Sequence, residues 1–84
     1  MDERMAWCLY LYPASGGGPQ VHELASTADV LEVERALDGC ARGEFVTIPS
    51  VFQDGIADLE LRIQPHVWGA WVIAESALRS ATPR

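Results

Sequence analysis

Apolar and polar positions follow a helical period in one stretch of the chain, from Ser26 to Gly43. The apolar positions there recur at steps of three and four residues: Val30, Val33, Leu37, Cys40 and Ala41. The opposite side is polar and carries Glu32, Glu34, Arg35, Asp38 and Arg42. Asp29 followed by Glu32 has the spacing of a capping box, and Gly43 stands where a left-handed residue ends a helix. This stretch predicts an amphipathic helix that needs a surface to lie on.

A period of two residues predicts strands on both sides of that helix. The segment from Ala6 to Tyr12 is apolar or aromatic on both faces, and we therefore expect a central strand that Pro13 ends. One face carries Trp7, Leu9 and Leu11, and the other carries Cys8, Tyr10 and Tyr12. The segment from Gln20 to Ala25 alternates less regularly and is a second strand candidate.

Two further segments after the helix are expected to pair as a hairpin. These are Glu44 to Ile48 and Ala57 to Ile63, joined by a turn at Asp54 and Gly55. The second segment alternates strictly, with Leu59, Leu61 and Ile63 on one face and Asp58, Glu60 and Arg62 on the other. Such alternation predicts a strand with one solvated face, as antiparallel sheets commonly have.

The last apolar segment, residues 66–74, follows Pro65 and fits two structures. Its apolar members are Val67, Trp68, Trp71, Val72 and Ile73, which are types that favour a strand but that also recur at helical spacing. We expect a strand, with a helix as the alternative; in a regular strand Trp68 and Trp71 fall on opposite faces. A short helix or a frayed tail is expected from Glu75 to Ala81.

These elements predict an α+β fold in a single domain of residues 1–84. The expected architecture is an antiparallel or mixed sheet of four to five strands with one amphipathic helix on one face, in the order β-(β)-α-β-β-β. Residues 1–4 and 82–84 are expected to be mobile termini.

Charge and composition exclude several classes of partner. The chain has 84 residues, a formal net charge of −6 and a pI near 4.6. Nucleic acids and anionic membranes are bound through clustered cations, so we expect neither as a partner. The sequence has no apolar run near the roughly 20 residues of a membrane span and no secretion signal, which favours a cytoplasmic protein. In a reducing compartment Cys8 and Cys40 are expected to be free, although a bridge stays possible if the first strand runs beneath the helix.

Candidate chemistry is sparse. The loop at Gly16 to Gly18 follows a strand but lacks the spacing of a phosphate-binding motif, and the chain has no lysine. The four soft or imidazole ligands, Cys8, His22, Cys40 and His66, have no paired spacing, so we expect no metal and no cofactor. No thiol or hydroxyl stands beside a base in a recognisable pattern, so we name no catalytic residue and favour a non-enzymatic protein.

The functional hypothesis is based on aromatic residues that the expected core does not cover. Tyr10, Tyr12 and Trp68 are expected to form an outward patch, and Trp71 completes the candidate interface set, because Trp and Tyr dominate interface energies. We therefore expect a small acidic protein-interaction module whose partner is a protein, in the first place a second copy of itself. An alternative is that loops of the same copy cover these rings.

Two other functional hypotheses remain open. One is a ligand-binding or enzymatic domain in which the loop of residues 13–19 closes over a pocket beside Cys8 and His22. The other is an acidic inhibitor or mimic that occupies a basic site on another protein. Its acids are Glu32, Glu34, Asp38, Asp58 and Glu60.

Overall fold

The computed structural model describes residues 3–51 and 58–79, and the side chains of residues 5–51 and 58–76. Its elements are β1 (Glu3–Pro13), β2 (Gln20–Glu23), α1 (Val30–Gly39), β3 (Val46–Val51), β4 (Asp58–Ile63), the 3-10 helix η1 (Pro65–Val67) and β5 (Trp68–Arg79). The predicted α+β class is confirmed, with one α-helix and five strands among the described residues. The segment 66–74 is mainly a strand, as its residue types favoured.

The strands form two antiparallel sheets in place of the single sheet that the sequence suggested. A three-stranded sheet has the order β2-β1-β5, and β3 pairs with β4 in a two-stranded sheet. The two sheets meet just beyond the end of β2, where Leu24 bridges Ser50 and the Ala25 amide donates to the Pro49 carbonyl at 3.0 Å. The Ser50 side chain is buried at this junction, and its hydroxyl donates a hydrogen bond to the Glu23 carbonyl at 2.7 Å. The buried hydroxyl is therefore satisfied.

The helix begins where the sequence predicts and ends earlier. Asp29 is the N-cap, and its Oδ1 accepts from the amides of Leu31 and Glu32 at 3.1 and 3.3 Å. The last helical residue is Gly39, because Cys40 is extended and η1 meets the helix end: His66 Nε2 donates to the Cys40 carbonyl at 2.7 Å. Gly43 has the expected positive φ of 89°, but it lies in the following turn and does not end the helix.

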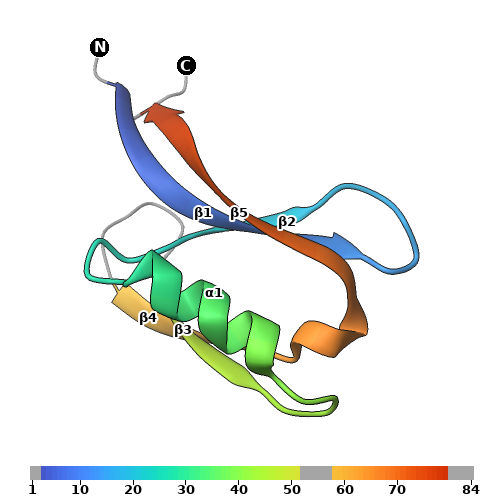
Figure 1. Ribbon diagram of the computed structural model, residues 1–84. Coiled ribbons are helices and arrows are strands. Elements are labelled where there is room, and N and C mark those ends of the chain that lie inside the picture. Colours follow the sequence, from blue (N-terminus) through green and yellow to red (C-terminus); the bar gives the residue numbers. More distant parts are fainter. Residues whose placement is uncertain (1–2, 52–57, 80–84) are drawn as a thin grey trace.

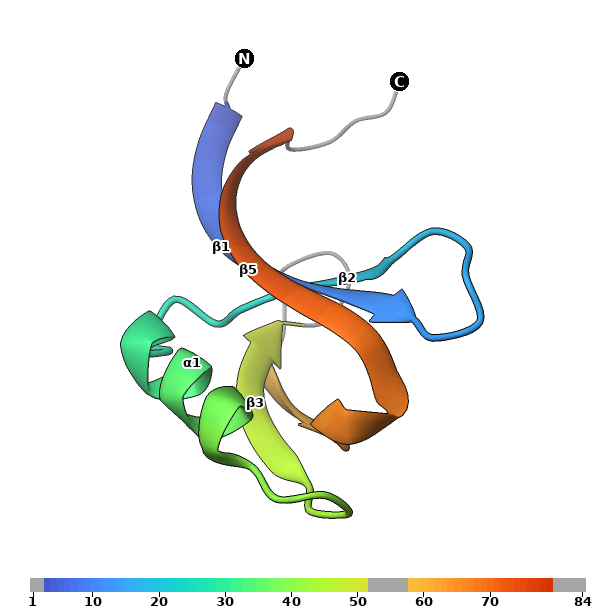
Figure 2. The same ribbon diagram turned by 45° about the vertical axis from the view of Figure 1, so that its right-hand side comes forward.

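One hydrophobic core lies between the three-stranded sheet, α1 and the β3–β4 sheet (Figure 1). Its buried members are Leu9, Leu11, Leu24, Val33, Leu37, Val46, Ile48 and Ile63. In Figure 1 the three-stranded sheet lies above the helix, and β3 and β4 lie below it. In Figure 2 α1 lies beside β3, so the helix and the β3–β4 sheet together cover one face of the three-stranded sheet and share one core with it. We call that face, which carries Leu9 and Leu11, the inner face.

A β-bulge in β5 corrects the prediction that Trp68 and Trp71 lie on opposite faces. Tyr12 pairs with Ala70 but Pro13 pairs with Trp68, so Gly69 is the extra residue. The extra residue turns Trp68 to the same face as Trp71, and both rings pack against the core. A Cβ at Gly69 would lie 3.0 Å from the Ala14 Cα, so glycine suits this close approach of two backbones.

The helix or tail expected from Glu75 is wrong as far as the described chain extends. β5 continues as a strand to Arg79, because β1 begins at Glu3 and supplies pairing partners over that whole length. The two strands project beyond the other elements as a two-stranded ribbon (Figures 1 and 2). Of the termini expected to be mobile, residues 3 and 4 lie in β1 and pair with β5; residues 1–2 and 82–84, like the predicted turn at Asp54 and Gly55, lie outside the described residues.

Candidate functional site

The candidate site is the outer face of the three-stranded sheet, which points away from α1 and the core. Residues opposite one another in an antiparallel sheet share a face, so the register assigns its members. They are Cys8, Tyr10, Tyr12, Val21, Glu23, Ala70, Val72, Ala74 and Ser76. Among the described elements, none packs across this face, since α1 and the β3–β4 sheet both lie on the other side (Figure 1).

The middle of the outer face is covered by its own side chains. The Tyr10 hydroxyl lies 2.5 Å from the Ser76 hydroxyl, although Tyr10 itself pairs with Val72. The ring must therefore lie along β5 and across the Cys8–Ala74 pair. This explains why Cys8 is only 2% exposed on a sheet face that no other element covers.

The rim of the outer face exposes apolar side chains from all three strands. Tyr12 on β1 is 38% exposed, Val72 on β5 is 45% exposed and Val21 on β2 is 52% exposed.

Burial and then the Glu23 carboxylate raise the pKa of the Cys8 thiol, while a hydrogen bond from Ser76 acts in the opposite direction. A buried thiol with a raised pKa is a weak nucleophile, so this face is suited to contact and not to covalent chemistry.

The structure brings together only part of the predicted interface set. Tyr10 and Tyr12 share the outer face, as the alternation along β1 predicts. Trp68 and Trp71 are half-buried on the inner side, against the core. The patch on the outer face is therefore made of tyrosine and valine, and the two tryptophans contribute to the stability of the fold.

The residues proposed for a ligand pocket do not meet. Cys8 pairs with Glu23 and Leu9 pairs with His22, so the Cys8 and His22 side chains lie on opposite faces of the sheet. His22 Nε2 is hydrogen-bonded to Gln20 Oε1 at 3.2 Å, and partial burial lowers the pKa of the imidazole. In the loop of residues 13–19, the Gly16 amide donates to the Pro13 carbonyl at 3.1 Å and forms a local turn.

Neither a disulfide nor a metal site is formed in the part of the chain that the structure describes. Cys8 and Cys40 are both free thiols, and Cys8 points away from the helix that Cys40 follows. Desolvation and the Glu44 carboxylate raise the pKa of the Cys40 thiol. Residues 3–51 and 58–79 contain no cluster of three His, Cys, Asp or Glu side chains able to hold a metal ion.

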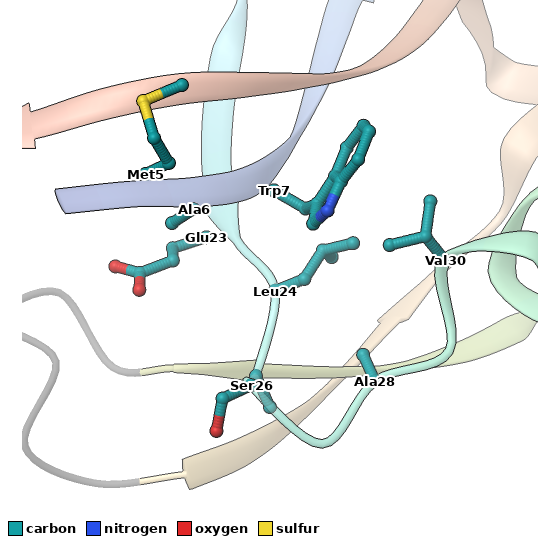
Figure 3. A pocket seen from close by; sticks show the side chains of 9 residues that line it. Met5, Ala6, Trp7, Glu23, Leu24, Ser26, Ala28 and Val30 are labelled. Atoms are coloured by element: carbon teal, nitrogen blue, oxygen red, sulfur yellow. The ribbon is translucent and has the colours of Figure 1, made fainter.

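A small pocket that the sequence did not predict opens beside Trp7. It has a volume of about 150 Å³ and lies between the start of β1, the β2–α1 connection and the first residue of α1. In Figure 3 the Trp7 ring, Leu24 and Val30 point toward one another, while the polar ends of Glu23 and Ser26, which also line the pocket, point away from these three side chains. The pocket is smaller than the roughly 300 to 1,000 Å³ that ligand sites usually offer.

The acids of the mimicry hypothesis are divided between two elements. Glu32 and Asp38 are exposed on α1, whereas Asp58 and Glu60 project from the outer face of the β3–β4 sheet. Asp58 and Glu60 alternate with Leu59 and Leu61 as predicted, so the solvated face of β4 is confirmed. The chain therefore spreads its negative charge over a helix and a sheet.

Comparisons with known proteins found no matching family model, no matching curated protein and no matching solved structure. Among the described residues, no helix combines the length and the apolar character that crossing a bilayer requires. The geometry of the two sheets is therefore the basis for a proposal about function.

Proposed function

We propose that this chain is a small non-enzymatic protein-interaction module that associates with itself through the three-stranded sheet. One observation supports the proposal: the described elements cover only the inner face of this sheet. Its outer face exposes Tyr12, Val21 and Val72, which come from three different strands and form a rim around the self-covered centre. A second copy that contacts this sheet, across its outer face or along β5, would shield Val72 and so remove part of that apolar surface from water.

The distribution of charge favours this sheet over the rest of the surface as a contact between copies. The chain carries a net charge of −6, so two copies repel one another wherever their acids face each other. Glu23 and Tyr10 aside, the outer face carries small or apolar side chains, whereas the outer face of the β3–β4 sheet carries Asp58 and Glu60. The three-stranded sheet is where two copies approach with the least repulsion.

The test is the oligomeric state of Val72→Arg, measured by light scattering over a range of concentrations. We expect the wild-type chain to form dimers and Val72→Arg to be monomeric, because the substitution places a cation in the apolar rim of each copy. Trp68 and Trp71 are poor probes, since both rings pack against the core and their removal would weaken the fold itself.

The matched control is Leu31→Arg on α1. Leu31 is 64% exposed and Val72 is 45% exposed, so both substitutions replace a surface aliphatic side chain and change the net charge equally. We expect Leu31→Arg to remain dimeric. A wild-type chain that stays monomeric at every concentration would refute the proposal, and equal loss of dimer in both variants would assign the effect to net charge and refute the role of the sheet.

A further inference from the structure

The outer edge of β5 is a row of backbone groups without a partner strand in the described chain. The sheet order is β2-β1-β5, so β1 occupies one side of β5 and no described strand lies on the other. β5 is 12 residues long and contains neither proline nor lysine, the residues that commonly protect a free edge. Such an edge is a template for pairing with another strand.

The hydrogen bonds of β1 show which amides of β5 face that edge. The Leu24 amide donates to the Trp7 carbonyl at 2.9 Å, so the backbone groups of Trp7 point toward β2. Successive residues of an antiparallel strand point to alternate sides, so those of Cys8 and Tyr10 point toward β5. Their partners Ala74 and Val72 point back toward β1.

The intervening residues of β5 therefore point outward. Trp71, Ile73 and Glu75 present their amides and carbonyls to the free edge. Their side chains belong to the inner side of the sheet, so the edge is formed by backbone and not by the exposed rim of the outer face. This edge is distinct from the apolar patch of Tyr12, Val21 and Val72.

We infer that the free edge of β5 pairs antiparallel with β5 of a second copy around a twofold axis, joining two three-stranded sheets into one of six strands. The inference rests on the proposed self-association and specifies its geometry. A second copy fits this edge because an antiparallel pair of identical strands is self-complementary: each outward residue offers one donor and one acceptor to an outward residue of the other copy. Glu75 is the one charged residue among the described side chains of β5, so few charges oppose the approach.

Charge selects the register of this pairing. Centring the axis on Glu75 would place two carboxylates directly opposite one another, which destabilises a strand pair. Centring it on Ile73 places Glu75 of one copy opposite Trp71 of the other. It also sets Val72 of one copy beside Ala74 of the other on the outer face, so that the apolar patches of the two copies become continuous.

Edge pairing also suits the structure better than face-to-face packing. The centre of the outer face is already covered, because Tyr10 lies over Cys8 and bonds to Ser76. The backbone groups of Trp71, Ile73 and Glu75 have no such cover from the described strands. Pairing the edge satisfies them with backbone groups of the second copy.

Amide hydrogen exchange of the wild-type chain, at a low and a high protein concentration, tests the geometry directly. The amides of Ala70, Val72 and Ala74 bond to β1 and should be protected at both concentrations. We expect the amides of Trp71, Ile73 and Glu75 to be protected only at the concentration where the chain is dimeric. A dimer in which these three amides exchange as fast as in the monomer would overturn edge pairing.

The variant Glu75→Pro removes one outward amide and leaves the β1–β5 ladder its donors. We expect the dimer dissociation constant to rise about tenfold or more, because twofold symmetry removes the bond in both halves of the pair. The control Glu75→Ala removes the same charge and keeps the amide, so it should dimerise like the wild type. Circular dichroism checks that both variants fold. If Glu75→Pro does not fold, hydrogen exchange of the wild-type chain is the test of edge pairing.

Tyr12→Arg separates failure of the edge from failure of self-association. Tyr12 lies on β1, one strand away from the edge, so edge pairing predicts that this variant stays dimeric. If Tyr12→Arg is monomeric while Glu75→Pro is dimeric, the two copies associate face to face. That result would refute edge pairing and would still support the proposed self-association. If the wild-type chain is monomeric at every concentration, both edge pairing and the proposed self-association are refuted.

Discussion

The two sheets of this protein are built from similar alternation and differ in what their outer faces carry. On the β3–β4 sheet the outer face holds Asp58, Glu60 and Arg62, and the Arg62 guanidinium lies 4.9 Å from the centre of the neighbouring Phe45 ring. On the three-stranded sheet the corresponding positions are tyrosine, valine and alanine. The first face is solvated by its own charges, and the second exposes an apolar rim.

The difference shows what an outer face with few charges requires of a small protein. Beside the β3–β4 sheet, the exposed Phe45 ring, which directly precedes β3, lies under the Arg62 guanidinium, which is a favourable surface contact. The three-stranded sheet covers only its centre, through Tyr10, and leaves its rim and the edge of β5 open. This asymmetry is why the proposed association is placed on one sheet and not on the other.

The largest effect is expected from matched core truncations, one in each sheet. Leu9 in β1 and Ile48 in β3 are both 0% exposed and belong to one cluster. We expect Leu9→Ala and Ile48→Ala each to lower the free energy of unfolding by about 2 to 5 kcal/mol in a denaturant titration. Both variants should unfold in one transition, because the sheets share a core.

Val21→Ala is the control for these truncations. Val21 is 52% exposed on the outer face, and its truncation should change the free energy of unfolding by less than about 1 kcal/mol. Two separate unfolding transitions in either core variant would show that the two sheets unfold independently, as two domains would.

An intermediate effect is expected at the bulge that turns Trp68 toward the core. Gly69→Ala introduces a Cβ at 3.0 Å from the Ala14 Cα, so the end of β1 must shift. We expect a loss of about 1 to 3 kcal/mol in stability and a change in tryptophan fluorescence as Trp68 moves. Gly39→Ala meets open space and should be neutral or slightly stabilising; an equal loss in both variants would contradict the role of the bulge.

The smallest effect is expected from the polar contact that covers the centre of the outer face. Tyr10→Phe removes the hydroxyl that bonds to Ser76, and we expect a loss of about 0.5 to 1.5 kcal/mol in unfolding free energy. Cys8 should also become easier to alkylate as the ring loosens above it. Tyr12→Phe, on the same face, should change neither quantity; unchanged alkylation of Cys8 in Tyr10→Phe would show that the ring does not guard the thiol.

Local patterns in the sequence were sufficient for most of the fold. The Asp29 cap and the stripe containing Val33 and Leu37 define α1, and the alternation from Asp58 to Ile63 defines β4 and its solvated face. The same alternation places Tyr10 and Tyr12 on one face of β1. These features depend on residues close together in the chain, so a short window of sequence contains the information.

The remaining features depend on pairing between distant residues. The last described segment is a strand because Glu3 to Ala6 offers a partner to Ser76 to Arg79, and short-range propensity at Glu75 does not reveal that partner. The direction of Trp68 follows from one bulge residue, which shifts the period of two and cannot be counted before the register is known.

The order of neighbouring side chains is enough to specify the class of fold, the helix with its cap and the solvated face of β4, and the residue composition is enough to specify the acidic charge. Three other features emerge only in the folded chain: the division of the strands between two sheets, the packing of Trp68 and Trp71 against the core, and an edge of β5 that no described strand covers. Those features are set by which strands pair and in which register, and register is fixed by contacts between residues that lie far apart in the chain.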